Sequence, residues 1–98
     1  MEESKISNRL IELGVPGHLW GFDCIIKSCQ LIAEDPRAYK ARAPYLFERV
    51  ADAVGLTSHK TVEKDIRYAI SRIDIDAFPR CKRMNNMQFL YWLYYTLK

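Results

Sequence analysis

The stretch 58–73 holds the side chains best suited to contact with a partner molecule. Lys60, Lys64 and Arg67 are spaced three or four residues apart. On a helix, at about 100° per residue, they lie roughly 140–200° from Val62, whose face carries the apolar residues. Long cationic donors on an outward face suit guanine edges and the phosphates of nucleic acid. The spacing therefore favours a nucleic-acid contact, although a charged helix face is more often simply solvated.

Neighbouring side chains extend this surface. Glu63 offers a carboxylate that can accept from a cytosine amino group or orient a nearby Arg or Lys. The expected base-facing residues are Lys60, Thr61, Glu63, Lys64 and Arg67. The expected phosphate contacts, which position a protein without specifying sequence, are His59, Tyr68, Arg80, Lys82 and Arg83. For His59, an ordinary residue in the first turn of a helix is an equally good interpretation.

The elements around this stretch must present it outward. Pro44 suits the first turn of a preceding helix, and Gly55 is placed to end that helix. Thr57 or Ser58 can cap the next helix by accepting from an exposed backbone N–H. Two helices joined by a short turn that contains glycine form a helix-turn-helix. We predict one at about 44–73, with the stretch described above as its recognition helix.

Apolar residues recur at helical spacing through the rest of the chain. They predict a short helix ending at Leu13, a longer helix over 17–34 and a last helix over about 86–97. Residues 74–84 predict a loop, and no strand or internal repeat is evident. The expected fold is all-α, a small helical bundle of about five to six helices that forms a single domain over 1–98.

Composition excludes several classes of protein. The 98 residues are 49% hydrophobic and 28% charged, which is typical of one folded domain. No apolar run approaches the roughly 20 residues that span a bilayer, and the charged N-terminus lacks a signal-peptide core. The net charge is +3, with the positive charge concentrated in the second half. We expect a cytoplasmic protein without a membrane partner. The charge asymmetry suggests that its binding partner is a polyanion.

No catalytic, metal or cofactor signature is visible. The three cysteines are an odd number in unrelated contexts, and we interpret Cys24 and Cys29 as packing residues. His18 has no second ligand at plausible spacing, so we expect it to cap a helix or to pack beside Trp20. There is no Ser/His/Asp set, acid pair or glycine-rich phosphate loop. We expect neither an enzyme nor a bound cofactor or small-molecule substrate.

The last predicted helix contains MQFLYWLYYTL and carries more aromatic side chains than one helix face can bury. These are Phe89, Tyr91, Trp92, Tyr94 and Tyr95. Core packing accounts for some of them. The remainder suggests a homodimer, tandem copies on DNA or another partner interface through this helix.

Four segments, in order, resemble one protein family. Residues 14–22, GVPGHLWGF, resemble its GVP-x-H-x-x-G-aromatic opening, and the match continues at Val50 and Ala51. Residues 61–71, TVEKDIRYAIS, are similar to its RVERAIRHAIE recognition helix, and residues 85–90, NNMQFL, are similar to its TNSEFI. The family is the C-terminal DNA-binding effector domain of the sporulation-initiation response regulator. The resemblance covers nearly the whole chain.

This resemblance implies a six-helix domain of a bacterial transcription regulator. In the family, the recognition helix enters the major groove of double-stranded DNA, often as tandem copies on repeated sites. Glu63 and Arg67 match the family's Glu and Arg, and Lys64 stands where the family has Arg. Thr61 replaces an Arg and Tyr68 replaces a His.

Three departures from the family pattern bear on these expectations. The segment between the recognition helix and the last helix is shorter than the family's, so we expect a short helix to be missing there. Asp65 puts an acid where the family has Ala, which would weaken or redirect contacts in the groove. No phosphoacceptor receiver domain precedes the domain in this sequence, so we expect it to stand alone without the usual phosphorylation switch.

Two functions stay open at this point. The first is a sequence-specific DNA-binding domain of a transcriptional regulator. The alternative is a helical protein–protein interaction module that has lost DNA binding and acts through its aromatic C-terminal helix. The basic face of 58–73 discriminates between them, because a pure interaction module has no reason to keep it.

Overall fold

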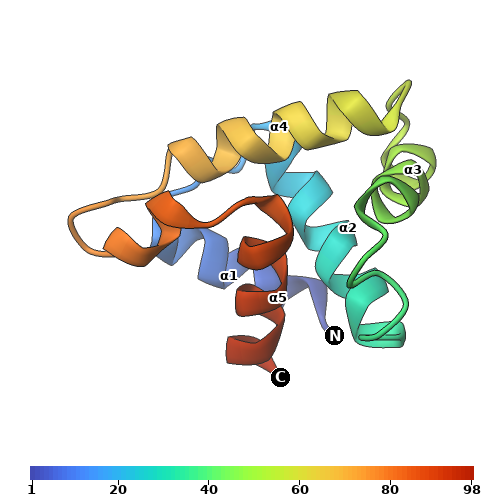
Figure 1. Cartoon of the computed structure of the whole chain (residues 1–98). Coiled ribbons are helices and arrows are strands. Elements are labelled where there is room, and N and C mark those ends of the chain that lie inside the picture. Colours follow the sequence, from blue (N-terminus) through green and yellow to red (C-terminus); the bar gives the residue numbers. More distant parts are fainter.

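Five α-helices and one short 3-10 helix form the fold, and the prediction of an all-α bundle is confirmed (Figure 1). The computed structural model describes all 98 residues and contains no strand. No helix is both long and apolar enough to cross a membrane. The elements in chain order are α1 (Glu3–Leu13), α2 (Trp20–Glu34), α3 (Ala43–Val54), α4 (His59–Ser71), η1 (Pro79–Arg83) and α5 (Asn86–Leu97).

The turn after α1 joins two distant parts of the chain. Gly14 has φ 96°, a left-handed conformation that glycine adopts without steric cost, and its N–H bonds back to the carbonyls of the last turn. The carbonyl oxygen of Leu13 accepts from the backbone N–H of Asp74 at 2.9 Å. The end of α1 is therefore tied to the segment that follows α4.

The start of α2 differs from the prediction. The helix begins at Trp20 and not at residue 17, because the chain turns once more after Pro16 before Leu19 takes the N-cap position. His18 is exposed and does not cap α2, so the first of its two expected roles, helix capping or packing beside Trp20, was wrong. Trp20 is 58% exposed as well, so this turn faces solvent.

Local chemistry sets the turn between α3 and α4 as predicted. Gly55 ends α3 with φ 81°, and the hydroxyl of Ser58 caps α4 by accepting from the backbone N–H of Thr61. α4 ends at Ser71, two residues before the predicted end, although the next apolar residue, Ile73, is still buried.

α2 is the central helix, and α1, α3, α4 and α5 all pack against it. α4 lies across one end of the bundle in Figure 1. α4 comes close to α2 because Gly21 has no side chain, and an added Cβ there would lie 2.2 Å from the carbonyl oxygen of Asp65. The inner face of α4 is formed by Val62, Ile66, Ala69 and Ile70, all buried.

Most of the aromatic residues of α5 are packed inside the protein. Phe89, Tyr91 and Tyr94 are buried, and the hydroxyl of Tyr91 donates to the carbonyl of Pro36 at 2.6 Å. Trp92 is half-buried, and only Tyr95 is largely exposed, at 46%. Core packing therefore accounts for more of these residues than the sequence suggested.

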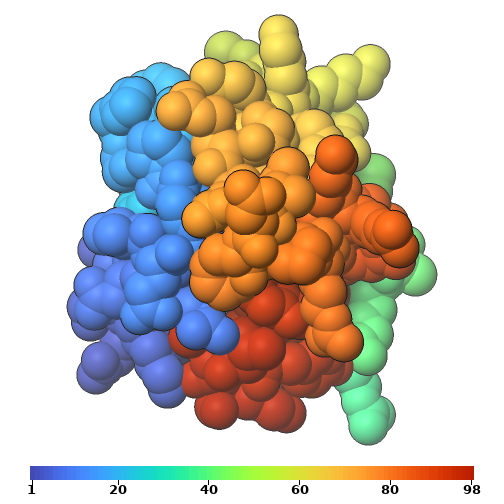
Figure 2. Space-filling view, turned by 90° about the vertical axis from the view of Figure 1, so that its left-hand side faces the viewer, coloured from blue at the N-terminus to red at the C-terminus, as the bar shows by residue number.

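The segment 74–84 is not a simple loop. Its second half forms η1, a single 3-10 helix that buries Cys81. The prediction of a loop was wrong for these five residues, and η1 occupies the place where a short helix was expected to be missing. Figure 2 shows that this segment, in orange, covers the middle of one face, with the N-terminal part of the chain (blue) to its left and α5 (red) below it.

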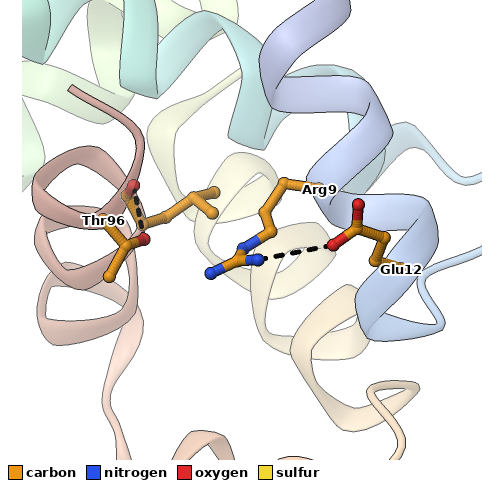
Figure 3. Close-up of polar contacts among 4 residues, drawn as sticks. Arg9, Glu12 and Thr96 are labelled. Carbon is orange, nitrogen blue, oxygen red and sulfur yellow. Dashed lines mark hydrogen bonds and ion pairs between the residues drawn. The ribbon is translucent and has the colours of Figure 1, made fainter.

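Arg9 extends from α1 toward α5 (Figure 3). Its guanidinium pairs with Glu12 at 3.3 Å, while its Nε is buried without a hydrogen-bond partner. On α5, the hydroxyl of Thr96 donates to the carbonyl of Leu93 at 3.1 Å. Both residues of this ion pair belong to α1, so it does not neutralise any charged side chain of α4.

Candidate nucleic-acid interface

The outer face of α4 presents the predicted row of charges. Lys60, Glu63, Lys64 and Arg67 are all exposed, while the opposite face of the helix is buried. Thr61 is half-buried, and its hydroxyl lies 3.3 Å from that of Ser58, so it belongs to the cap of the helix. Because the inner face is fixed in the core, the outer row has a defined direction.

This row forms one wall of a surface groove of about 610 Å³. The other walls come from the start of α3 and the start of α5. The lining residues are Ala43, Phe47, Lys60, Glu63, Lys64, Arg67, Asn85, Asn86 and Met87. Four of the five base-facing candidates thus share one groove, and Thr61 lies outside it.

Two hydrogen bonds join α4 to the start of α5 across this groove. Arg67 donates from Nη1 to the carbonyl of Met84 at 2.9 Å, and Asn86 donates from Nδ2 to the carbonyl of Glu63 at 3.0 Å. Asn85 caps α5 in a reciprocal arrangement, because its side chain accepts from the N–H of Gln88 while the Gln88 side chain accepts from the N–H of Asn85. The start of α5 is therefore fastened to α4 by two hydrogen bonds, and its own cap keeps its first turn helical.

Sequence reasoning missed the walls that α3 and α5 contribute. The segment NNMQFL marked the start of a helix but gave no sign that this start lies beside Glu63, 23 residues earlier. A groove built by contacts between distant segments leaves no local signal in the sequence.

The positive charge of the groove is not neutralised within the protein. Arg9 forms an ion pair with Glu12, and Nδ1 of His59 lies 3.8 Å from the Glu48 carboxylate; neither contact involves a lining residue. The three cations of the groove face a single lining carboxylate, that of Glu63. Unpaired cations concentrated in a hollow raise the local concentration of anionic partners.

The phosphate candidates are more scattered. His59 is half-buried and lies 3.8 Å from the Glu48 carboxylate, in a separate hollow between α3 and α4. Tyr68 is 53% exposed near the end of α4, and its hydroxyl accepts from Arg72 at 3.3 Å. The remaining three, Arg80, Lys82 and Arg83, are exposed on η1.

The buried thiols offer neither a nucleophile nor a metal site. All three cysteines are free and buried. Burial raises the pKa of the Cys29 thiol from 9.0 to about 12, and burial together with the charges of Asp65 and Asp23 raises the pKa of Cys24 to about 12. No three His, Cys, Asp or Glu side chains lie close enough together to hold a metal ion. The interpretation of Cys24 and Cys29 as packing residues is confirmed.

Comparison with known proteins identifies the family. The family model described as "Sporulation initiation factor Spo0A C terminal" matches residues 6–93. The comparison with curated proteins gave no match. The matched range contains the whole of α2, α3, α4 and η1 and most of α5, and so includes every residue that lines the groove. The chain therefore belongs to the Spo0A C-terminal domain family, whose members are DNA-binding effector domains of a transcription regulator.

Proposed function

We propose that this domain binds duplex DNA in a sequence-specific way, with α4 in the major groove. The observation that carries the proposal is the row of exposed, unpaired cations on α4, a helix whose opposite face is fixed in the core. Lys60 and Lys64 can donate to guanine O6 and N7, and Glu63 can accept from a cytosine amino group. Thr61 and Arg67, the other two base-facing candidates, are not assigned to base reading, because Thr61 lies outside the groove and one arm of the Arg67 guanidinium is bound to the carbonyl of Met84.

Contacts with the DNA backbone would come from residues on either side of that row. We assign phosphate contacts to the three cations of η1 and to two residues of α4: Arg80, Lys82, Arg83, His59 and Tyr68. Side chains of this kind fix the register of a protein on the duplex and carry no sequence information directly. Membership of a family of DNA-binding regulator domains supports a contact with DNA as such.

Binding to a selected site and to a scrambled site separates the two kinds of contact. Lys64→Ala should weaken binding to the selected site by roughly 5- to 150-fold more than binding to the scrambled site, because a base contact discriminates by about 1–3 kcal/mol. Lys82→Ala should weaken both about equally and make the plot of log K against log salt shallower by roughly one unit.

Lys5→Ala supplies the control. Lys5 is an exposed cation on α1, outside the groove, and its loss removes the same charge. If Lys64→Ala and Lys5→Ala have equal effects on both sites, the groove does not read bases.

We also propose that α5 contributes a contact between copies of the domain, since Tyr95 is 46% exposed among the otherwise packed aromatic residues of this helix. Tyr95→Glu should lower self-association, measured by sedimentation, without loss of helical content. A wild-type protein that stays monomeric at high concentration, with and without DNA, would rule this out. The alternative of a pure interaction module predicts the opposite pattern: Tyr95→Glu abolishes partner binding, and the α4 variants change nothing.

A further inference from the structure

The start of α5 forms a wall of the groove, and specific side chains hold it there. The segment Met84–Asn86 precedes or begins α5, and the two hydrogen bonds described above fasten it to α4. One runs from Arg67 of α4 to the carbonyl of Met84 at 2.9 Å, and the other runs from Asn86 to the carbonyl of Glu63 at 3.0 Å. They run in opposite directions, since each segment donates once and accepts once.

These two bonds also use donor groups of Arg67 and Asn86 that could otherwise form hydrogen bonds with DNA bases. The amide nitrogen of Asn86 donates to the backbone of α4, and the Asn86 Oδ1 atom is shielded from solvent. Arg67 is exposed, but one arm of its guanidinium is bound to a carbonyl oxygen. Lys60, Glu63 and Lys64 differ, because their side chains make no hydrogen bond or ion pair within the protein.

We infer that Arg67 and Asn86 are positioning residues, which act on DNA by holding the start of α5 as the fixed second wall of the groove. This inference rests on the proposed DNA binding of the same groove and assigns base reading to Lys60, Glu63 and Lys64. A wall fixed before DNA arrives lowers the conformational entropy lost on binding, so it raises affinity for every sequence alike. It adds no preference for one base over another.

A base reader and a positioning residue leave different patterns across DNA sites. The dissociation constant is measured for a selected site, for its single-base-pair variants and for a scrambled site, with the wild type, Arg67→Ala, Asn86→Ala and the double variant. Each single substitution should weaken binding to all sites by the same factor, about 3- to 10-fold, the range that one net hydrogen bond allows. The order of preference among the sites should not change.

The double variant tests whether the two residues act through one wall. Because both fasten the same segment, the loss in the double variant should be clearly smaller than the product of the two single losses. The free energy of unfolding is measured on the same four proteins. A merely structural role would lower the free energy of unfolding in step with the affinity, whereas positioning predicts a loss of affinity that persists when the domain is fully folded.

Lys64→Ala is the matched control on the same row of α4. In DNA-free protein, Arg67→Ala and Asn86→Ala should shift the amide resonances of residues 84–87, and Lys64→Ala should leave them in place. The inference is overturned if Arg67→Ala flattens the preference at one base pair, or if those resonances do not move. Failure of the proposed function looks different, because the wild type itself would then show no DNA binding.

Discussion

Gly21→Ala tests the close approach of α2 and α4 that fixes the direction of α4, the proposed recognition helix. An alanine Cβ at this position would lie 2.2 Å from the carbonyl oxygen of Asp65 and 2.8 Å from the Cβ of Ala69. Both distances are shorter than atoms tolerate, and the nearer neighbour is backbone of α4, which cannot swing aside as a side chain can. The two helices must therefore move apart.

The cost follows from two opposing effects. Overpacking of a core contact costs about 1–3 kcal/mol, and a clash with backbone belongs at the upper end, about 3 kcal/mol. Alanine in place of glycine within a helix returns at most about 1 kcal/mol. We expect a net loss of about 2 kcal/mol in the free energy of unfolding, which lowers Tm by roughly 8–16 °C in a domain of this size.

Urea denaturation followed by circular dichroism measures this loss. Gly17→Ala is the matched control, because an added Cβ there meets nothing within 4 Å and the backbone is not left-handed. That variant should stay within about 0.5 kcal/mol of the wild type or be slightly more stable. If Gly21→Ala is as stable as the wild type or more so, which helix propensity alone predicts, the close packing of α2 on α4 is wrong.

Two further predictions concern the cap of α4 and the buried thiols. Ser58→Ala should lower the free energy of unfolding by about 1 kcal/mol in urea, because it removes the acceptor for the N–H of Thr61, whereas Thr57→Ala, at an exposed residue that caps nothing, should not. Burial raises the pKa of Cys29 from 9.0 to about 12, so the neutral thiol is favoured in the folded state. Its contribution to stability should be complete below pH about 9 and decline as the pH rises toward 12. Cys29→Ala should make that decline shallower, and an equal decline in both proteins would contradict the assignment.

The helix-turn-helix could be predicted from the sequence because its signals are local. Gly55 ends α3 in the left-handed conformation, Ser58 caps α4, and the spacing of Val62, Ile66 and Ala69 defines the buried face. Each of these features depends on residues within a few positions of one another. The outward direction of Lys64 follows from the same periodicity.

The other walls of the groove could not be predicted, because tertiary contacts create them. The carbonyl of Met84 meets Arg67 across 17 positions in the chain, and Tyr91 reaches Pro36 across 55. The second contact also explains why more aromatic residues of α5 are buried than the sequence suggested, because the connector after α2 covers part of this helix. The role of Gly21 in the packing of α2 against α4 could not be predicted for a similar reason. The sequence motif contains this glycine but does not show that α4 lies against it.

The most direct test of the central claim is a fluorescence-anisotropy titration of the intact domain with duplex DNA at several salt concentrations. A pool of genomic fragments supplies the DNA. If about four to six phosphates are contacted, log K should fall with log salt with a slope of roughly −4 to −5. A variant carrying Lys60→Glu and Lys64→Glu should lose this binding while keeping its helical content. Absent binding by the folded wild type, or binding that salt does not weaken, would contradict the assignment of α4 and its groove as a DNA-binding surface.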